Sequence, residues 1–149
     1  MLQGDVQGAV FVDLFSGSGA IGIEALSRGA RKAYFVETAS RALDCIQQNL
    51  TFTKLQNRAI LIKQEACSAL SSIMEEAVDI IFMDPPYGHG HEKSVLSALQ
   101  NKAYVTEATL IIVEASLDTD FSWLKELGFA LEKEKRYKTN KHMFIRKAW

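Results

Sequence analysis

Length, composition and charge already exclude several classes of protein. The chain has 149 residues, 48% apolar and 23% charged, which fits one globular domain with a substantial core. Cys45 and Cys67 form no CxxC pair and have no histidine at metal-ligand spacing, so neither a disulfide framework nor a metal site is expected. No apolar run reaches the roughly 18 to 20 residues of a membrane span, and the polar start MLQGDVQG is unlike a signal peptide. We therefore expect a cytoplasmic protein without a membrane partner. A monomer is our working expectation, since these residues do not determine the oligomeric state.

The net charge of −1 is unevenly distributed along the chain. Residues 131–149 carry seven Lys or Arg against two Glu, whereas the first 130 residues carry ten basic against sixteen acidic side chains. Lysines on an exposed edge strand can serve to block aggregation. Alternatively, the basic end of the chain forms a patch that contacts phosphates. The sequence leaves both interpretations open.

In chain order, apolar β-rich runs alternate with segments that have helical spacing. The expected elements are a strand at 9–15, a helix at 19–28, a strand at 33–37, a helix at 40–54, a strand at 59–63, a helix at 66–75, a strand at 78–83, a helix at 92–101 and a strand at 108–114. A helix between each pair of strands calls for a parallel sheet with helices on both faces, a doubly wound α/β fold.

The last part of the chain has a different pattern. A short helix is expected at 121–127, closed by Gly128. Residues 129–138 and 142–147 then predict two antiparallel strands, joined by a turn at Thr139, Asn140 and Lys141. Five parallel strands followed by a helix and a hairpin resemble the mostly parallel, seven-stranded, Rossmann-like sheet of class I S-adenosylmethionine-dependent methyltransferases.

A glycine-rich stretch, DLFSGSGAIG, follows the first expected strand. Gly17, Gly19 and Gly22 match GxGxxG, and Glu37 lies twenty residues beyond Gly17. Glycine lets the backbone turn sharply and approach a ligand, and a helix start offers free N–H groups to an anion. The anion is a pyrophosphate in a nicotinamide enzyme and a carboxylate in S-adenosylmethionine. Asp13 opposes a pyrophosphate but suits the ammonium and sulfonium charges, so it favours the methyltransferase over the dehydrogenase.

Two further acids follow the second and third strands. Glu37 is placed to accept hydrogen bonds from both hydroxyls of a ribose, although it is also an ordinary acid before the helix at Ser40. At Glu65 and Ala66, a side chain can meet the adenine amine and a backbone N–H can meet the ring. The alternative for Glu65 is that it caps the following helix.

The tetrapeptide DPPY ends the most apolar run of the middle of the chain, 77–83. Pro85 and Pro86 have no backbone N–H, and Pro85 keeps Asp84 out of the helical region, so the chain is stiff and extended where the strand ends. A carboxylate, two carbonyl groups and the Tyr87 ring are therefore presented together at the sheet edge where α/β proteins bind ligands. A simple strand-terminating turn is the alternative.

Three stretches together, 13–30, 35–37 and 79–88, resemble the RsmD family, bacterial methyltransferases that act on the exocyclic N2 amine of a guanine in small-subunit (16S) ribosomal RNA. The resemblance implies S-adenosylmethionine as cofactor, no metal, and ribosomal RNA or a small-subunit particle as partner. The implied catalytic residues are Asp84, Pro85, Pro86 and Tyr87. The implied cofactor-binding residues are Asp13, Phe15, Gly17, Ser18, Gly19, Glu37, Thr38, Glu65 and Ala66.

The chain departs from this family at its beginning. Members usually carry several tens of residues before the first strand, with a basic segment and an Arg-Pro-Thr stretch. We therefore expect residues 1–149 to be a single methyltransferase domain without that extension. Other acceptors stay open, because DPPY is shared with amino methyltransferases that act on adenine in DNA or on protein amides. A non-catalytic module that keeps the fold is a further alternative.

Overall fold

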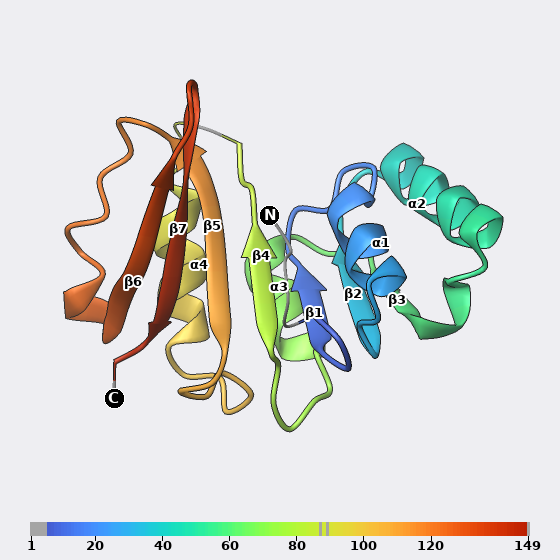
Figure 1. Cartoon of the computed structure of the whole chain (residues 1–149), viewed down its shortest axis with the longest axis horizontal. Helices are drawn as coiled ribbons and strands as arrows, with labels where there is room; N and C mark the ends of the chain where they lie inside the picture. Colours follow the sequence, from blue (N-terminus) through green and yellow to red (C-terminus); the bar gives the residue numbers. More distant parts are fainter. Residues whose placement is uncertain (1–5, 87, 89, 149) are drawn as a thin grey trace. The chain divides into compact units, whose positions relative to one another are not determined.

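The computed structural model of the chain describes residues 6–86, 88 and 90–148 (Figure 1). Tyr87, a member of the expected catalytic tetrapeptide, lies outside the described residues. The chain divides into two compact units, Met1–Met74 and Glu75–Trp149, and each is described by itself. Among the described residues, no helix combines the length and the apolar composition that a membrane crossing requires.

The first unit is a small parallel sheet with its connecting helices. Its elements are β1 (Val10–Asp13), α1 (Ala20–Ser27), β2 (Lys32–Val36), α2 (Ser40–Thr53), the 3-10 helix η1 (Gln56–Arg58), β3 (Ala59–Ile62), α3 (Ala66–Ala69) and the 3-10 helix η2 (Leu70–Ser72). The strand order is β3-β2-β1, and both pairings are parallel. The carboxyl ends of all three strands therefore lie at one edge.

The second unit combines two parallel strands with the antiparallel hairpin. Its elements are β4 (Ile80–Met83), α4 (His91–Leu99), β5 (Leu110–Ser116), the 3-10 helix η3 (Lys125–Leu127), β6 (Phe129–Arg136) and β7 (Asn140–Lys147). The strand order is β4-β5-β7-β6, with β4 parallel to β5 and β7 antiparallel to both of its neighbours (Figure 1). Asp84 follows the carboxyl end of β4, at the edge where β5 also ends.

Burial explains why these segments are strands. All four residues of β1 and all four of β4 are buried, as a strand covered on both faces requires. Helix α1 packs closely on β2 because Gly22 has no side chain. A Cβ at Gly22 would lie only 2.4 Å from Cε2 of Phe35. The third glycine of the GxGxxG pattern thus permits the helix to approach the sheet.

The described residues contain seven strands, and the expected α/β class with a C-terminal antiparallel hairpin is confirmed. Several element boundaries differ from the sequence prediction. The helix expected at 66–75 ends at Ala69 and continues only as a 3-10 turn. The helix expected at 121–127 is reduced to η3, although Gly128 closes it with φ 81°. The hairpin turn also lies earlier than predicted, because Asn140 and Lys141 already belong to β7.

Candidate active site

The glycine loop after β1 is held in conformations that only glycine adopts easily. Gly17 has φ 55° and Gly19 has φ 82°, both in the left-handed region. A Cβ at Gly19 would lie 2.9 Å from Cγ1 of Ile46, so this position is also tightly packed. At Gly17 no atom lies within 4 Å of that position, so its backbone borders open space. The loop therefore exposes a bare main chain at Gly17, ahead of α1.

Glu37 fixes this loop to the start of α2. One carboxylate oxygen, Oε1, accepts the Gly17 N–H at 2.9 Å, and Oε2 accepts the N–H groups of Thr38 at 3.0 Å and Ala39 at 2.9 Å. Glu37 therefore acts as the acid before helix α2, which was one of its two expected roles. Its contact with the glycine loop was not indicated by the sequence. A carboxylate has about four acceptor positions. Three are occupied, which leaves one on Oε1 for a ligand hydroxyl.

Asp13 shapes the turn from inside the protein. Its residue is only 1% exposed, its Oδ1 accepts the Phe15 N–H at 3.3 Å, and its carbonyl oxygen accepts the Ser16 hydroxyl at 3.0 Å. The Ser18 carbonyl accepts a long bond, 3.4 Å, from Nδ2 of Asn49 on α2. Asp13 and Phe15 therefore belong to one hydrogen-bonded turn at the carboxyl end of β1, and Ser18 is bonded to α2.

Glu65 is the N-cap of α3, as its alternative interpretation predicted. Its Oε1 accepts the backbone N–H of Ser68 at 2.7 Å and the Ser68 hydroxyl at 3.0 Å. The neighbouring Ala66 is buried. Cys67 is only half-buried, and desolvation, followed by the charge of Glu65, raises the pKa of its thiol. A raised pKa disfavours the thiolate, so Cys67 is a poor nucleophile.

The first unit also has a hollow of about 420 Å³ beside the glycine loop. This volume lies within the range of roughly 300 to 1,000 Å³ found for small-molecule sites. It is lined by Gly17, Ser18, Ala39, Arg41, Ala42 and Cys45. The open backbone of Gly17 and the remaining acceptor position of Glu37 suit a ligand that carries hydroxyl groups. The N–H groups of Gly17 and Gly19, expected to meet an anion, are instead donated to Glu37 and to the Ser16 carbonyl, at 2.9 and 2.8 Å. The residues present therefore fit a nucleoside-type cofactor.

In the second unit, the two prolines hold Asp84 at the end of β4. Pro85 is buried and Pro86 is exposed, so the first proline anchors the segment. The described residues provide no hydrogen-bond donor to the Pro85 carbonyl group. That carbonyl is therefore available as an acceptor next to the Asp84 carboxylate.

The surroundings of Asp84 favour its protonated form. Although much of the residue faces solvent, partial desolvation raises the pKa of its carboxyl group, and the charge and hydrogen bond of Glu114 raise it further, to about 6. Glu114 lies on β5, the neighbour of β4. Two carboxyl groups thus meet where these parallel strands end, and such pairs are common in active sites.

Glu114 is in turn held by His142 on β7, its cross-strand partner in the sheet. Nε2 of His142 lies 2.9 Å from Oε1 of Glu114, and Nδ1 is buried with no hydrogen-bond partner among the described residues. Neither Glu114 nor His142 was among the site residues expected from the sequence. The available signal was the alternation of β5 and β7, but their register was needed to join residues 28 positions apart.

The expected site residues therefore form two groups. Asp13, Phe15, Gly17, Ser18, Gly19, Glu37, Thr38, Glu65 and Ala66 lie where β1, β2 and β3 of the first unit end. Asp84, Pro85 and Pro86 lie at the end of β4 in the second unit, with Glu114 beside Asp84. Within the described residues, no three His, Cys, Asp or Glu side chains are grouped to hold a metal ion.

Comparison with known proteins supports a methyltransferase family. The family model described as conserved hypothetical protein 95 matches residues 1–146. The ribosomal RNA small subunit methyltransferase D of Buchnera aphidicola (strain APS) is 32% identical over 103 residues, which are 69% of this chain and 53% of the relative. The Escherichia coli K12 protein of the same name is 29% identical over 109 residues, 72% of this chain and 53% of that protein. The chain thus spans about half the length of these curated relatives.

Solved structures agree with the fold. The protein HI0767 of Haemophilus influenzae matches with a TM-score of 0.85 and 26% identity, covering 97% of this chain and 82% of that chain. The ribosomal protein L11 methylase of Lactobacillus delbrueckii matches with a TM-score of 0.80 at 16% identity, over 97% of this chain and 72% of that one, which shows a shared class I methyltransferase fold. From the family model and the curated relatives together, the chain belongs to the RsmD-like methyltransferase family.

Proposed function

We propose that the chain carries the methyl-transfer site of an S-adenosylmethionine-dependent enzyme that modifies the N2 amine of a guanine in small-subunit ribosomal RNA. The observation that carries this proposal is Asp84, an acid fixed by two prolines at the end of β4, with its pKa raised to about 6 beside Glu114. Membership in the RsmD-like family and the names of its curated relatives support ribosomal RNA as the substrate class.

The first unit supplies the cofactor residues of the proposed site. The turn at Gly17 and Gly19 brings bare main chain beside the carboxylate end, with its own N–H groups donated to Glu37 and to the Ser16 carbonyl. Glu37 keeps one acceptor position for a ribose hydroxyl. Asp13, Phe15, Ser18 and Thr38 shape the turn, and Glu65 with Ala66 borders the adenine. S-adenosylmethionine, when bound, supplies an electrophilic methyl group on a positively charged sulfonium.

The second unit holds the acceptor amine. The lone pair of an exocyclic guanine amine is delocalised into the ring, so the amine is a weak nucleophile. The Asp84 carboxylate accepts one N–H and the Pro85 carbonyl accepts the other, which favours a pyramidal nitrogen whose lone pair is free to attack. Positioning of this kind accounts for the largest part of the acceleration. The proton that the methylated amine releases passes to Asp84, whose raised pKa makes it an effective base near neutral pH.

Tyr87 and Pro86 complete the proposed acceptor site. Pro86 keeps the chain extended after Pro85. The Tyr87 ring stacks on the target base, a contact that contributes about 1–3 kcal/mol. That is comparable with the few kcal/mol needed to unstack a base. The partner is ribosomal RNA or a small-subunit particle in the cytoplasm, and the protein acts as a monomer without a metal ion.

A methyl-transfer assay tests the proposal. Labelled S-adenosylmethionine is incubated with the protein and with small-subunit particles or ribosomal RNA from a strain that lacks the corresponding enzyme, and duplex DNA and a protein extract serve as parallel acceptors. We expect label in ribosomal RNA, recovered as N2-methylguanosine after digestion, and no label with Asp84→Ala. Label found only in DNA or protein would show that the acceptor is not ribosomal RNA. If calorimetry detected no binding of S-adenosylmethionine, the proposal of an enzyme would be wrong.

A further inference from the structure

Three polar side chains form a row across three neighbouring strands of the second unit. Asp84 follows β4, Glu114 lies on β5 and His142 lies on β7, and the strand order is β4-β5-β7. Glu114 and His142 are partners in the register, and Nε2 of the imidazole lies 2.9 Å from Oε1 of the carboxyl group. A hydrogen bond also joins Glu114 to Asp84. Glu114 therefore connects His142 to the acid of the proposed acceptor site.

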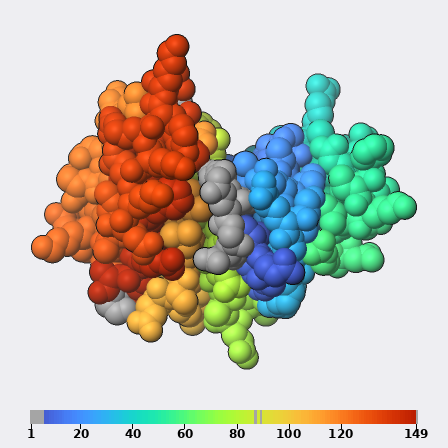
Figure 2. All heavy atoms as spheres, in the orientation of Figure 1, coloured from blue at the N-terminus to red at the C-terminus, as the bar shows by residue number. Residues whose placement is uncertain are grey.

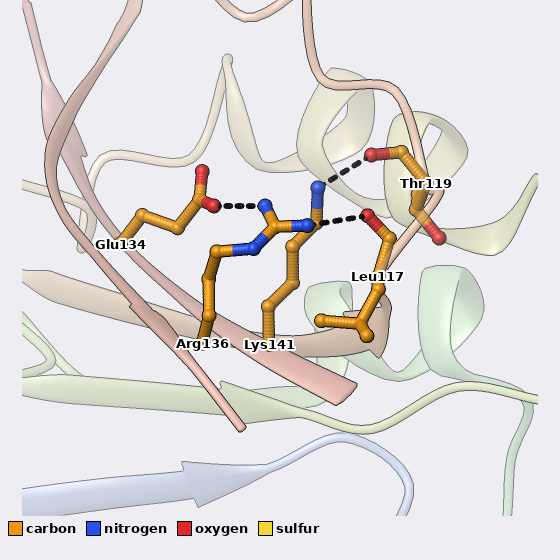
Figure 3. Close-up of polar contacts among 5 residues, drawn as sticks. All are labelled: Leu117, Thr119, Glu134, Arg136 and Lys141. Atoms are coloured by element: carbon orange, nitrogen blue, oxygen red, sulfur yellow. Dashed lines mark hydrogen bonds and ion pairs between the residues drawn. The ribbon is translucent and has the colours of Figure 1, made fainter. Parts of the chain in front are cut away.

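The start of β7 is held against the segment that follows β5 (Figure 3). Nζ of Lys141 donates to the Thr119 carbonyl at 2.8 Å, and Nη2 of Arg136 donates to the Leu117 carbonyl at 3.4 Å. Lys141 is only 6% exposed and directly precedes His142. These bonds fix the strand next to His142, so the position of the imidazole does not depend on its own hydrogen bond alone.

His142 is nearly buried, and one of its ring nitrogens has no partner. The residue is 7% exposed, its ring centroid lies 4.8 Å from that of Tyr137, and Nδ1 forms no hydrogen bond with any described residue. The charged register partners of His142 are Glu114 on β5 and exposed Lys135 on β6, which have opposite signs. The unpaired Nδ1 distinguishes the protonation states, because an imidazolium would leave a buried N–H without an acceptor. The ring is therefore assigned a single N–H.

The single N–H of the imidazole belongs on Nε2. In this tautomer the N–H donates to the Glu114 carboxylate, and Nδ1 keeps only an unpaired lone pair. In the other tautomer the buried N–H at Nδ1 has no acceptor, and Glu114 must itself be protonated in order to donate to Nε2. The Nε2–H tautomer pairs the one N–H of the ring, so His142 acts as a donor to a charged Glu114.

The hydrogen bond between the two acids requires one proton. Two carboxylates have only acceptor oxygens, so either Asp84 or Glu114 must carry a hydrogen. A donor stabilises a charged carboxylate more than a neutral carboxyl group, because charge-assisted hydrogen bonds are the stronger ones. The Nε2–H of His142 therefore keeps Glu114 charged and leaves the proton on Asp84. The raised pKa of Asp84 agrees with this direction.

We propose that His142 is a positioning residue of the methyl-transfer site, which donates its Nε2–H to Glu114 and so makes Asp84 the acid that takes up the proton of the methylated amine. This inference rests on the proposed function. In that step an N–H bond of the amine breaks and an O–H bond forms on Asp84, whose new hydrogen then donates to Glu114. Without the imidazole donor, Glu114 would compete for the proton and Asp84 would be the weaker base.

Two amide variants of His142 differ only in the reach of the side chain. The amide NH2 of His142→Gln extends about as far as Nε2, whereas that of His142→Asn ends near the position of Nδ1 and does not meet Glu114. Carbon NMR of labelled aspartate, with Asp84→Asn to identify the signal, follows the titration of Asp84. We expect a midpoint near pH 6 in the parent and in His142→Gln. In His142→Asn the midpoint should lie about one pH unit lower, because the charge-assisted bond to Glu114 is lost.

Methyl transfer gives a readout that a purely structural role of His142 would not change. The pH at which the rate falls should stay near pH 6 in His142→Gln and move about one pH unit lower in His142→Asn. In a Glu114→Gln background both amide variants should share one profile, because no Glu114 charge remains for the imidazole to stabilise. A shift of the same size in that background would overturn the proposal.

Nitrogen NMR tests the tautomer in the unchanged chain. Of the three histidines, the signals of His142 are those that His142→Gln removes. We expect a protonated Nε2 and a bare Nδ1 at pH 8, and the reverse would overturn the proposal. Equal Asp84 midpoints in the two amide variants, with methyl transfer intact, would also overturn it and leave the proposed function standing. The expected midpoints without methyl transfer by the parent would support the coupling of His142 to Asp84 and overturn the proposed reaction.

Discussion

Asp84 is the residue at which stability and activity conflict. Because its carboxyl group has a pKa of about 6 in the folded chain and 3.8 as an isolated side chain, the folded protein binds this proton more tightly than the unfolded one. The charged form therefore costs stability above pH 6, and the cost disappears below pH 3.8. The proposed catalysis needs the charged form of Asp84. It would therefore take place at a pH at which the Asp84 charge destabilises the fold.

The first prediction follows from this sign. Asp84→Asn should raise the melting temperature at pH 8, lose this advantage near pH 4, and lower methyl transfer roughly a hundredfold or more, because the amide keeps an acceptor oxygen but has neither the charge nor the basicity of the carboxylate. Thermal unfolding at both pH values and a single-turnover assay measure the two effects. A variant that melts lower than the parent at pH 8 would show that the Asp84 charge is stabilised, contrary to its surroundings.

The second prediction concerns Glu114, which acts on Asp84 from β5. The rate of methyl transfer should fall as the pH is lowered through about 6, because protonated Asp84 can no longer take up the proton that the methylated amine releases. Glu114→Gln removes the neighbouring negative charge and should move this fall to lower pH without abolishing the rate. The pH profiles of the parent and the variant are the measurement, and coincident profiles would rule out Glu114 as the cause.

At the scale of elements, helix α1 depends on a missing side chain. We predict that Gly22→Ala destabilises the chain by about 1–3 kcal/mol, since the new methyl group would lie 2.4 Å from the ring of Phe35 and must push α1 away from β2. Urea denaturation measures the change in the free energy of unfolding. Ser27→Ala, an exposed position of the same helix, is the matched control and should change it by less than about 0.5 kcal/mol. An equal effect of the two variants would contradict the close packing.

Local patterns in the sequence predicted most elements because strand and helix periods differ clearly along the first 116 residues. The predictions were wrong where hydrogen bonds of polar side chains determined where a helix or strand begins or ends. The helix at 66–75 stops early, in a stretch where the Ser72 hydroxyl bonds Gln64 at 2.7 Å, and serine hydroxyls compete with helical bonding. Strand β7 begins at Asn140, a residue typical of turns, because it pairs there with Ser116.

The candidate site divides in the same way. Asp84, Pro85 and the glycine loop could be identified from the sequence because each belongs to a motif of a few consecutive residues. The contact of Glu114 with His142 could not, since it arises from the antiparallel register of β5 and β7. The link between Glu37 and Gly17 was likewise invisible until β1 and β2 were aligned.

At the scale of the whole molecule, the basic end of the chain is less available than its charge suggests. Lys141 and Lys147 donate to backbone carbonyls of Thr119 and Val105, and Arg146 is paired with Glu132. Strand β6 is the outer strand of its unit and is exposed from Ala130 to Arg136, and Figure 2 shows the hairpin tip projecting from its unit. Edge protection therefore accounts for part of the charge.

Two cations of this hairpin, Lys135 and Lys138, are exposed and have no partner among the described residues. Lys135→Gln combined with Lys138→Gln should lower RNA affinity and reduce the slope of log affinity against log salt by about two, roughly one for each phosphate that a lysine no longer neutralises. Filter binding at several salt concentrations is the measurement. Lys54→Gln, an exposed cation of the first unit, should leave the slope unchanged. An unchanged slope in the double variant would assign both lysines to edge protection alone.

The three backbone bonds of Glu37 have a consequence for how the proposed cofactor would be exchanged. A glycine turn without these bonds would have to become ordered each time a new cofactor molecule bound. The entropy lost in this ordering would reduce the free energy of binding. Here the ordering is completed once, when the chain folds. The glycine turn is already tied to Glu37 in the folded chain, so the proposed exchange of spent for new cofactor should proceed by docking rather than by refolding of the loop.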